Sequence, residues 1–397
     1  MALQSNGNEG GRVSATVSWE PHAGSIFSVT DGSEGPSAKD GECGEPAGVC
    51  RGAAIFPRIG APILMKPSMG NFPLIAIVGP TAAGKSALAL ALAERLNGEV
   101  VNYDSVQLYR GFDVGSGKLL LAERRGIAHH LLDCLEPADV FTAGDYRREA
   151  LKVLTDLRGR EKLPILVGGT GLYLRALLVG LFEGPVRSEA LRERLRAIVE
   201  RRGREFLHRL LARLDAAAAA RIQPRDTQKL IRAVEVCVLA QRPLSALHAR
   251  GRRGLEGYAV IKIGLNPPRA LLYDRINRRV ETMFAAGLME ESQVLLHHPD
   301  AARIKPLGAL GYRQACEVWE GKVSREEAVS ATQAATRHYA KRQLTWFRRE
   351  SDITWFEGFG DDPHVQGRIV ETLRRTPVTA GEGTVLISDV APASNRH

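Results

Sequence analysis

The sequence predicts an α/β fold in which a parallel β-sheet is interrupted by a helical insertion. Short apolar runs alternate with helical patterns from Leu74 to Val167, in the order strand, helix, strand, helix, strand. This order is typical of a parallel sheet covered by helices. From Arg187 to Gln241 the residues Arg, Leu, Ala and Glu dominate without a strand pattern, which favours helices. A strand pattern returns at Tyr258–Leu265, so the helical segment lies within the sheet sequence.

In the first half of the sheet, the residues that follow each apolar run mark where each strand ends. Gly79 and Pro80 stop the first run, and Gly168 and Gly169 stop the third. Between the strands, apolar residues recur at helical spacing. The predicted elements are a strand at Leu74–Val78, a helix at Lys85–Leu96, a strand at Glu99–Asp104, a helix at Gly144–Leu157 and a strand at Pro164–Val167.

After the strand at Tyr258–Leu265 the sequence predicts three helices. The last of them begins with Ser324 and Glu327, whose spacing is that of a capping box at a helix N-terminus. These helices are expected around Arg269–Ala286, Ala309–Glu320 and Arg325–Arg349.

The chain has 397 residues, enough for more than one domain. Residues 1–70 are rich in Gly and show little periodicity, and residues 359–397 look similarly loose, so we expect both to be disordered. The α/β core is expected at residues 72–184 and 258–358, and the helical insertion at residues 185–257.

Composition excludes several classes of protein. No run of eighteen uncharged apolar residues occurs, and the N-terminal residues lack the pattern of a secretory or transit peptide. The five Cys residues show no CxxC spacing, which argues against a zinc finger or a disulfide scaffold and predicts a cytoplasmic protein. The net charge is +9, and because residues 1–70 are acidic the remainder is more basic still, which indicates an anionic partner.

A phosphate-binding loop follows the first predicted strand. Residues 79–86 match the pattern GxxxxGK[ST] and lie between a strand and a helix, as in a P-loop NTPase-like sheet. In such a loop the backbone N–H groups surround a phosphate, Lys85 supplies a positive charge, and the Ser86 hydroxyl can hold Mg²⁺. The diphosphate-binding residues are therefore Gly79, Pro80, Thr81, Ala82, Ala83, Gly84, Lys85 and Ser86.

Asp104 is the candidate catalytic carboxylate, because it ends the second predicted strand, where open α/β sheets place their ligands. The strand at Pro164–Val167 ends in Gly-Gly-Thr-Gly and offers no acid for a Walker-B site. Two functions stay open on this argument: a group transferase, and a small-metabolite or nucleoside kinase in which Asp104 acts on a hydroxyl. A GTPase-like RNA-binding module is disfavoured, because no N/T-K-x-D motif occurs.

Several further motifs, taken in order, resemble those of the bacterial tRNA dimethylallyltransferases, also called tRNA isopentenyltransferases. The resemblance covers about residues 72–358. Its motifs are the phosphate loop, Asp104–Arg110, Asp113–Lys118, His129–Asp133, Phe141 with Asp145-Tyr146, Gly168–Tyr173, Arg225–Glu235, Leu310–Gln314 and Thr336–Arg348.

The resemblance implies transfer of a dimethylallyl group from dimethylallyl diphosphate to N6 of adenosine-37, in tRNAs that read codons beginning with U. It implies that Asp104 takes the proton from N6 and that Thr170 hydrogen-bonds the adenine. Mg²⁺, held with Ser86, is the expected cofactor. The expected partners are tRNA, through its anticodon stem-loop, and the prenyl diphosphate, with no membrane; we expect a monomer.

The resemblance also implies a set of tRNA-binding residues. Two groups of basic residues at helical spacing, Arg225, Lys229 and Arg232, and Arg337, Lys341 and Arg348, support it from the sequence. The expected tRNA-binding residues are Asp104, Ser105, Val106, Gln107, Thr170, Arg192, Gln228, Lys229, Leu230, Ile231, Arg232, Gly311, Tyr312, Arg313, Gln314, Lys341, Arg342, Gln343, Leu344, Thr345, Trp346, Phe347 and Arg348.

Overall fold

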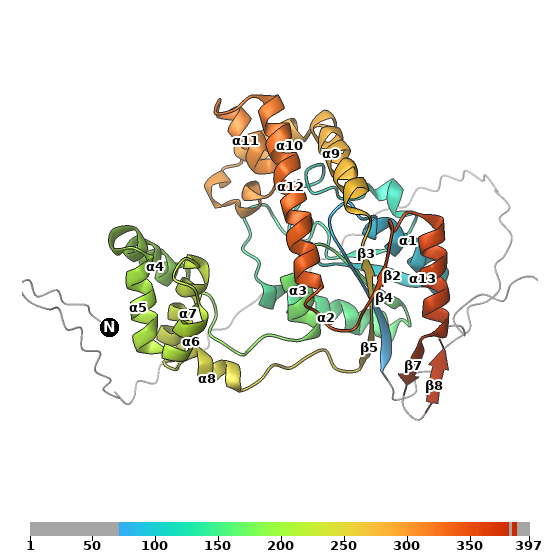
Figure 1. Ribbon diagram of the computed structural model, residues 1–397, viewed down its shortest axis with the longest axis horizontal. Coiled ribbons are helices and arrows are strands. Elements are labelled where there is room, and N and C mark those ends of the chain that lie inside the picture. Colours follow the sequence, from blue (N-terminus) through green and yellow to red (C-terminus); the bar gives the residue numbers. More distant parts are fainter. Residues whose placement is uncertain (1–70, 381–382, 387–397) are drawn as a thin grey trace, which may run out of the picture. The chain divides into compact units, whose positions relative to one another are not determined.

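A computed structural model describes residues 71–380 and 383–386 (Figure 1). Its main sheet has six parallel strands in the order β3-β2-β4-β1-β5-β6. The strands are β1 (Phe72–Val78), β2 (Gly98–Asn102), β3 (His129–His130), β4 (Leu163–Val167), β5 (Tyr258–Leu265) and β6 (Ile353–Phe356). The parallel α/β fold predicted from the sequence is confirmed. The expectation of disorder for residues 1–70 lies outside the described residues.

Strand β1 lies near the middle of the sheet because both of its neighbours are apolar. Ile75 is in register with Ile165 of β4 on one side and with Ile261 of β5 on the other. Its side chain is completely buried, as expected where helices cover both faces of a parallel sheet. The phosphate loop therefore starts from an interior strand of the sheet.

Helices cover the two faces of the sheet with separate apolar clusters. One cluster joins the sheet to α1 (Lys85–Leu96) and α13 (Pro363–Arg375), with Leu88 and Ile369 fully buried. The other joins the opposite face to the remaining core helices, with Leu154 and Tyr312 fully buried. Those helices are α2 (Ala143–Gly159), α3 (Gly171–Leu178), α9 (Arg269–Ala285), α10 (Leu288–Leu296), α11 (Tyr312–Trp319) and α12 (Arg325–Phe347).

The insertion is helical throughout, as its composition predicts. It contains α4 (Glu189–Arg202), α5 (Arg204–Leu214), α6 (Ala216–Arg221), α7 (Thr227–Ala240) and α8 (Leu244–Ala249). Leu207, Leu211, Leu230 and Val234 are fully buried and form a cluster within the insertion itself. The insertion thus has its own apolar core.

The prediction of a disordered tail at residues 359–397 is wrong for the part that the structure describes. Helix α13 has Val365, Ile369 and Leu373 at helical spacing, and all three side chains are buried against the sheet. Strands β7 (Pro377–Ala380) and β8 (Gly383–Leu386) follow as an antiparallel pair. The amphipathic pattern of α13 is short and lies among polar residues, which explains why the sequence analysis missed it.

Strand β6 and helix α10 are among the elements that the sequence did not predict. Strand β6 is only four residues long and follows directly after a charged segment, and α10 is separated from α9 by Gly287 in a left-handed conformation (φ 105°). The predicted helix around Arg269–Ala286 matches α9, and the sequence analysis assigned no element to the residues of α10. Within residues 71–380 and 383–386, no helix is long and apolar enough to cross a membrane.

Candidate active site

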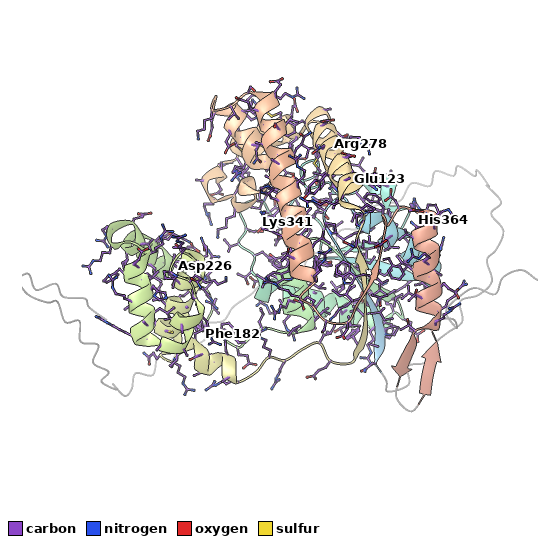
Figure 2. All side chains as sticks on the ribbon, in the orientation of Figure 1. Glu123, Phe182, Asp226, Arg278, Lys341 and His364 are labelled. Carbon is purple, nitrogen blue, oxygen red and sulfur yellow. The ribbon has the colours of Figure 1, made fainter. Side chains whose placement is uncertain are left out.

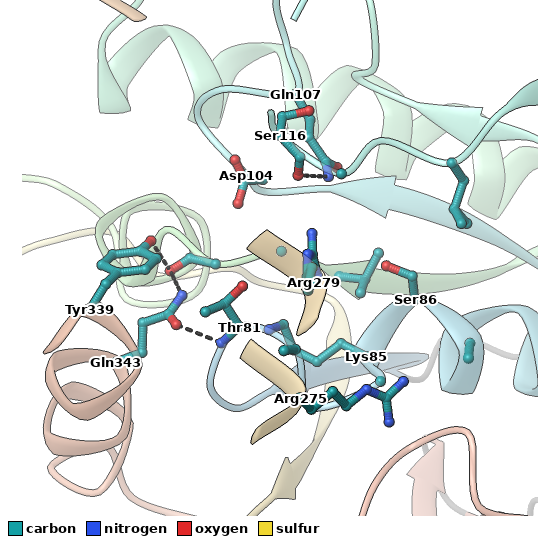
Figure 3. Close-up of a pocket in the computed structure, with 18 of the residues that line it drawn as sticks. Thr81, Lys85, Ser86, Asp104, Gln107, Ser116, Arg275, Arg279, Tyr339 and Gln343 are labelled. Carbon is teal, nitrogen blue, oxygen red and sulfur yellow. Dashed lines mark hydrogen bonds between the residues drawn. The ribbon is translucent and has the colours of Figure 1, made fainter. Parts of the chain in front are cut away.

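A pocket of about 640 Å³ opens where β1, β2 and β4 end at the carboxyl edge of the sheet (Figure 3). Its volume is within the range of small-molecule sites. The lining combines the phosphate loop, the loops after β2 and β4, and helices α9 and α12. Four cationic side chains and one carboxylate face it, so the pocket favours an anionic ligand: Lys85, Arg275, Arg278, Arg279 and Asp104.

The phosphate loop has the conformation that the glycines in its motif allow. Gly79 (φ 144°) and Gly84 (φ 83°) both have positive φ, which side-chain-bearing residues rarely adopt. A Cβ at Gly79 would also lie 2.8 Å from the Leu265 carbonyl oxygen, so no larger residue fits there. Lys85 Nζ donates to the carbonyl oxygens of Gly79 (3.1 Å) and Pro80 (2.8 Å), closing the loop over its own lysine. Ser86, Thr81, Ala82 and Gly84 line the pocket.

The charges around the loop act on one another. Burial lowers the pKa of Lys85 to about 7; the nearby Asp104 carboxylate opposes this shift and Arg279 adds to it. Burial also lowers the pKa of Arg279, again opposed by Asp104 and helped by Arg275. These cations are crowded together with little solvent, so a bound polyanion would relieve their mutual repulsion.

Asp104 is held by the loop that it begins. Its Oδ1 accepts the backbone N–H of Val106 (3.0 Å), and its own N–H donates to the side-chain oxygen of Asn102 (2.9 Å). Asn102 is buried and donates its amide to the carbonyl oxygens of Asp104 and Leu131. The other carboxylate oxygen, Oδ2, lies close to Gly169 and has no hydrogen-bond partner among the described residues. It is therefore available to accept a proton from a ligand in the pocket.

Thr170 lies beside Asp104, at the N-terminus of α3. Its hydroxyl accepts the backbone N–H of Ser105 and donates to the Ser105 hydroxyl, both at 3.0 Å. The loops after β2 and β4 are thus joined by side chains of the predicted site. Gln107 completes this wall by donating to the Ser116 carbonyl oxygen (3.2 Å) (Figure 3).

Helix α12 reaches the same place through two side chains. Gln343 is buried; its oxygen accepts the Thr81 N–H (2.7 Å), and its nitrogen donates to the Gly169 carbonyl oxygen (3.0 Å). Tyr339 donates to the same carbonyl oxygen (3.3 Å), and burial raises the pKa of its hydroxyl, with the Asp104 charge adding to this shift. A Cβ on Gly169 would clash with Gln343 and Asp104, so glycine is needed where these groups meet.

A second loop forms the far wall of the pocket and is held by Glu291 of α10. The Glu291 carboxylate accepts backbone N–H groups of Asp113 (3.1 Å), Val114 (2.8 Å) and Gly115 (3.2 Å). Tyr312 donates its hydroxyl to the same carboxylate. This arrangement fixes the segment that carries Ser116 and Gly117 into the pocket.

Several pocket residues were missed by the sequence analysis. Arg275, Arg278 and Arg279 come from α9, and Thr282 follows one turn later. In the sequence they form an ordinary charged helix, RINRRVET, with no glycine or strand beside it to mark a site. Only their spacing of three to four residues, which puts Arg275, Arg278, Arg279 and Thr282 on adjoining faces, could have indicated it.

The expected tRNA-binding residues of α12 divide into two groups. Lys341, Arg342, Thr345, Trp346 and Arg348 are exposed, with Lys341 labelled in Figure 2, whereas Gln343 and Phe347 are buried. Phe347 packs into the core, whereas Gln343 lines the pocket. The predicted RNA contacts of this helix are therefore kept for its exposed residues and for Gln343.

The same division appears in α11. Tyr312 and Gln314 are buried, and both use their polar groups inside the protein. Tyr312 donates to Glu291, and the Gln314 oxygen accepts the backbone N–H of Gly311 (3.0 Å). Arg313 is exposed, and its guanidinium lies 3.8 Å from the Glu317 carboxylate. Only Arg313 of these three offers a side chain to a partner.

In the insertion, two expected tRNA-binding arginines are paired with a buried acid. Arg192 donates to both oxygens of Glu235 (2.9 and 2.8 Å), and Arg232 donates to one of them (2.7 Å). Glu235 is completely buried; burial alone would raise its pKa, but hydrogen bonds from Arg192, Arg232 and the Ser188 N–H lower it to about 2. Arg192, with its side chain 13% exposed, holds the insertion together, and its predicted RNA contact stays a prediction.

The predicted basic stripe at Arg225, Lys229 and Arg232 also needs correction. Helix α7 begins at Thr227 with Asp226 as its N-cap, so Arg225 precedes the helix. Gln228 and Lys229 are exposed, whereas Leu230 and Ile231 are buried in the insertion core. Lys229 pairs with Asp226 (2.5 Å, labelled in Figure 2) and stays accessible, with its side chain 71% exposed.

Comparisons with known proteins show what this chain is similar to. The family model described as IPP transferase matches residues 107–350. A tRNA dimethylallyltransferase of Koribacter versatilis is 53% identical over 302 residues, covering 76% of this chain and 98% of the relative. A second, from Solibacter usitatus, is 51% identical over 294 residues and covers 74% of this chain and 95% of the relative.

Solved structures show the same likeness. The tRNA isopentenylpyrophosphate transferase of Bacillus halodurans is 38% identical, with a TM-score of 0.55, over 75% of this chain and 96% of that one. A eukaryotic dimethylallyltransferase acting on tRNA is 25% identical, with a TM-score of 0.61, over 72% of this chain and 74% of that one. The chain belongs to the IPP transferase family, that of the tRNA dimethylallyltransferases.

Proposed function

We propose that this enzyme transfers the dimethylallyl group from dimethylallyl diphosphate to N6 of adenosine-37 in tRNAs that read codons beginning with U. The observation that supports this most is that one pocket contains a phosphate loop, three arginines and the Asp104 carboxylate, which follows β2. A diphosphate and an acceptor base fit its two ends. The relatives are named as prenyl transferases and not as kinases, so the kinase alternative is set aside.

In the proposed reaction a bond forms between adenine N6 and C1 of the dimethylallyl group while the C1–oxygen bond breaks. The bonding electrons of the broken bond leave with the diphosphate. Lys85, Arg279 and the backbone N–H groups of the phosphate loop stabilise the negative charge that develops there. Asp104 accepts the N6 proton through Oδ2, the oxygen with no hydrogen-bond partner among the described residues.

Thr170 and Gly169 shape the acceptor end. Thr170 is fixed beside Asp104 by its hydrogen bonds to Ser105, and we propose that its hydroxyl exchanges one of them for the adenine edge. A target base must leave its stack to enter such a pocket, at a cost of about a few kcal/mol. Exposed Trp346 and the basic residues of α12 are suited to offset this cost by stacking and by phosphate contacts.

The residues present fit Mg²⁺ bound chiefly by the diphosphate itself. Ser86 places its hydroxyl at the start of α1, facing the pocket, while no group of three or more His, Cys, Asp and Glu suited to a metal occurs among the described residues. Mg²⁺ commonly keeps waters and binds substrate phosphates through few protein ligands. Ser86 would hold the ion, which would add charge neutralisation to that of Lys85.

We expect a monomer acting in the cytoplasm, where its tRNA substrate is found.

The test is a transfer assay with purified protein, Mg²⁺, labelled dimethylallyl diphosphate and an anticodon stem-loop with adenine at position 37. The proposal expects label in the RNA, lost when adenine-37 is replaced by guanine and kept when a neighbouring adenine is replaced. Label that follows a neighbouring adenine would contradict the assigned acceptor. Absence of label together with ATP turnover on a small hydroxyl compound would restore the kinase alternative.

A further inference from the structure

The segment that follows β6, with Gly360 and Asp361, packs against the backbone of the phosphate loop. The Gly360 N–H donates to the Ala83 carbonyl oxygen (2.9 Å). A Cβ at Gly360 would lie 2.5 Å from the Gly84 carbonyl oxygen, and one at Gly84 would lie 2.5 Å from Asp361 Oδ1. Two glycines therefore let the backbones touch, and this contact brings the Asp361 carboxylate to the edge of the pocket.

Asp361 and Phe359 hold one pocket arginine between them. Arg275 Nη1 donates to Asp361 Oδ1 at 2.8 Å, and the Arg275 guanidinium lies 4.8 Å from the centre of the Phe359 ring. Partial burial would raise the pKa of Asp361, but the hydrogen bond and charge of Arg275 keep it below its ordinary value. The carboxylate is thus ionised, and the pair is formed at neutral pH.

Arg275 in turn belongs to the anion-binding wall. It lines the pocket with Lys85 and Arg279, near the phosphate loop (Figure 3). Beyond its bond to Asp361, its guanidinium has no other hydrogen-bond partner among the residues that the structure describes. A guanidinium carries five N–H donors in a planar fork, so one side can bind a carboxylate while another binds a phosphate.

We propose that Asp361 is a positioning residue for the prenyl donor: it holds Arg275 at the pocket wall, and Arg275 contacts the donor's diphosphate. The identity of the donor rests on the proposed function. An arginine on a helix surface has many rotamers, and fixing it before binding removes an entropy cost that the ligand would otherwise meet. The Phe359 ring limits the same motion from the other side.

A role in which Asp361 competes with the diphosphate is also physically possible, and it predicts the opposite change in anion binding. If Asp361 competed with the diphosphate for Arg275, removing the carboxylate would strengthen anion binding. If Asp361 positions Arg275, removing it weakens binding, and only while Arg275 is present. A double-mutant cycle separates these cases.

The experiment measures binding of inorganic diphosphate to the full chain by calorimetry, in buffer with Mg²⁺. The variants are Arg275→Ala, Asp361→Asn and the double variant, with Asp274→Asn, an exposed acid next to Arg275 on α9, as the charge-matched control. We expect Arg275→Ala to weaken binding about tenfold and Asp361→Asn about three- to tenfold, as for loss of a charge-assisted hydrogen bond. The double variant should equal Arg275→Ala, and the control should equal the wild type.

Tighter binding by Asp361→Asn, or the same loss in the presence and absence of Arg275, overturns the proposal. In the transfer assay Asp361→Asn should raise KM for the prenyl donor and leave kcat unchanged, and Asp361→Glu should restore the wild-type KM. A fall in kcat at unchanged KM in Asp361→Asn also overturns the proposal. If the wild type transfers no prenyl group, the proposed function fails, yet the diphosphate cycle still decides the role of Asp361.

Discussion

Gln343 on α12 accepts the backbone N–H of Thr81 in the phosphate loop at 2.7 Å. The same side chain donates to the Gly169 carbonyl oxygen at 3.0 Å, so one amide joins the donor and acceptor ends of the pocket. Gln343 is buried, so these hydrogen bonds satisfy an amide that has little access to water. Helix α12 is therefore part of the active site, and Gln343 also lines the pocket.

Replacing Gln343 by alanine should destabilise the protein and weaken donor binding. Each buried polar group left without a partner costs about 1–3 kcal/mol. The matched variant Gln343→Glu keeps an acceptor for the Thr81 N–H but loses the N–H donor to the Gly169 carbonyl oxygen. Its binding of the prenyl donor should therefore be weakened less than that of Gln343→Ala. Thermal unfolding and KM for each substrate would check this; wild-type stability in both variants would contradict it.

Asp104→Asn should remove most of the chemical step and little of the RNA binding. Asparagine keeps an oxygen for the Val106 N–H but cannot accept the N6 proton, so kcat should fall by about 10²–10⁴-fold, the usual share of general base catalysis. Single-turnover transfer and a separate RNA-binding titration measure the two effects. Lost RNA affinity with a normal single-turnover rate would show that Asp104 is not the base.

Diphosphate binding should take up a proton above neutral pH. The pKa of Lys85 is about 7 in the free protein, so its ammonium is increasingly neutral as pH rises beyond that value. A bound polyanion favours the charged form and raises this pKa. Affinity for inorganic diphosphate should therefore fall from pH 7 to pH 9, and calorimetry in buffers of different ionisation enthalpy should detect proton uptake. In Lys85→Arg, which stays charged, the proton uptake should vanish.

Lys85 also makes the free protein more stable with rising pH in the same range. Its pKa lies below the ordinary value of 10.5, so between about 7 and 10.5 the unfolded chain binds more protons than the folded one. Urea unfolding from pH 7 to pH 9 should show this rise in the wild type and not in Lys85→Met. A fall in stability over this range that is the same in both would count against the shifted pKa.

Breaking the buried ion pair of the insertion should unfold it. Arg192→Ala leaves the carboxylate of Glu235 with one guanidinium in a buried site, and losing a partner of such a pair costs about 3–5 kcal/mol. The pair's contribution is present at neutral pH and should be lost as pH falls from about 4.5 toward 2, through the lowered pKa of Glu235. Thermal unfolding would check both statements; an unchanged Tm in Arg192→Ala would contradict them.

Lys229→Ala and Lys341→Ala should behave differently from Arg192→Ala. Both lysines are exposed, so their loss should leave the melting temperature unchanged and weaken tRNA binding in a salt-dependent way. Each removed phosphate contact should reduce the slope of log affinity against log salt by about one. Binding titrations at several salt concentrations measure this; a loss that is the same at all of them would indicate a different role.

The sequence was sufficient for the parts of the site that lie on glycine-rich loops. Gly79 and Gly168 mark strand ends, and strand ends in a parallel sheet meet at one edge, so the approach of Asp104 to the phosphate loop could be predicted. The helix at Lys85–Leu96 and the strand at Tyr258–Leu265 were predicted with their observed bounds.

The sequence was insufficient where a side chain acts across a long separation. Arg275 and Asp361 enter the site from a helix and a connecting segment whose local pattern is that of any solvated surface. Burial was equally hidden: Glu235 and Gln343 are polar residues at core positions, and only their partners reveal why they are there. Tertiary contact, which no periodicity encodes, decided these roles.

The central position of β1 has a consequence for synthesis of the protein on the ribosome. Ile75 pairs with Ile261, and the whole helical insertion is made between them. After β1, β2, β4 and the insertion have emerged, the apolar edge of β1 that β5 will occupy still has no partner from its own chain. By then the insertion can assemble its separate core. An unpaired apolar edge invites pairing with other chains, so this stage should be the one most dependent on chaperones.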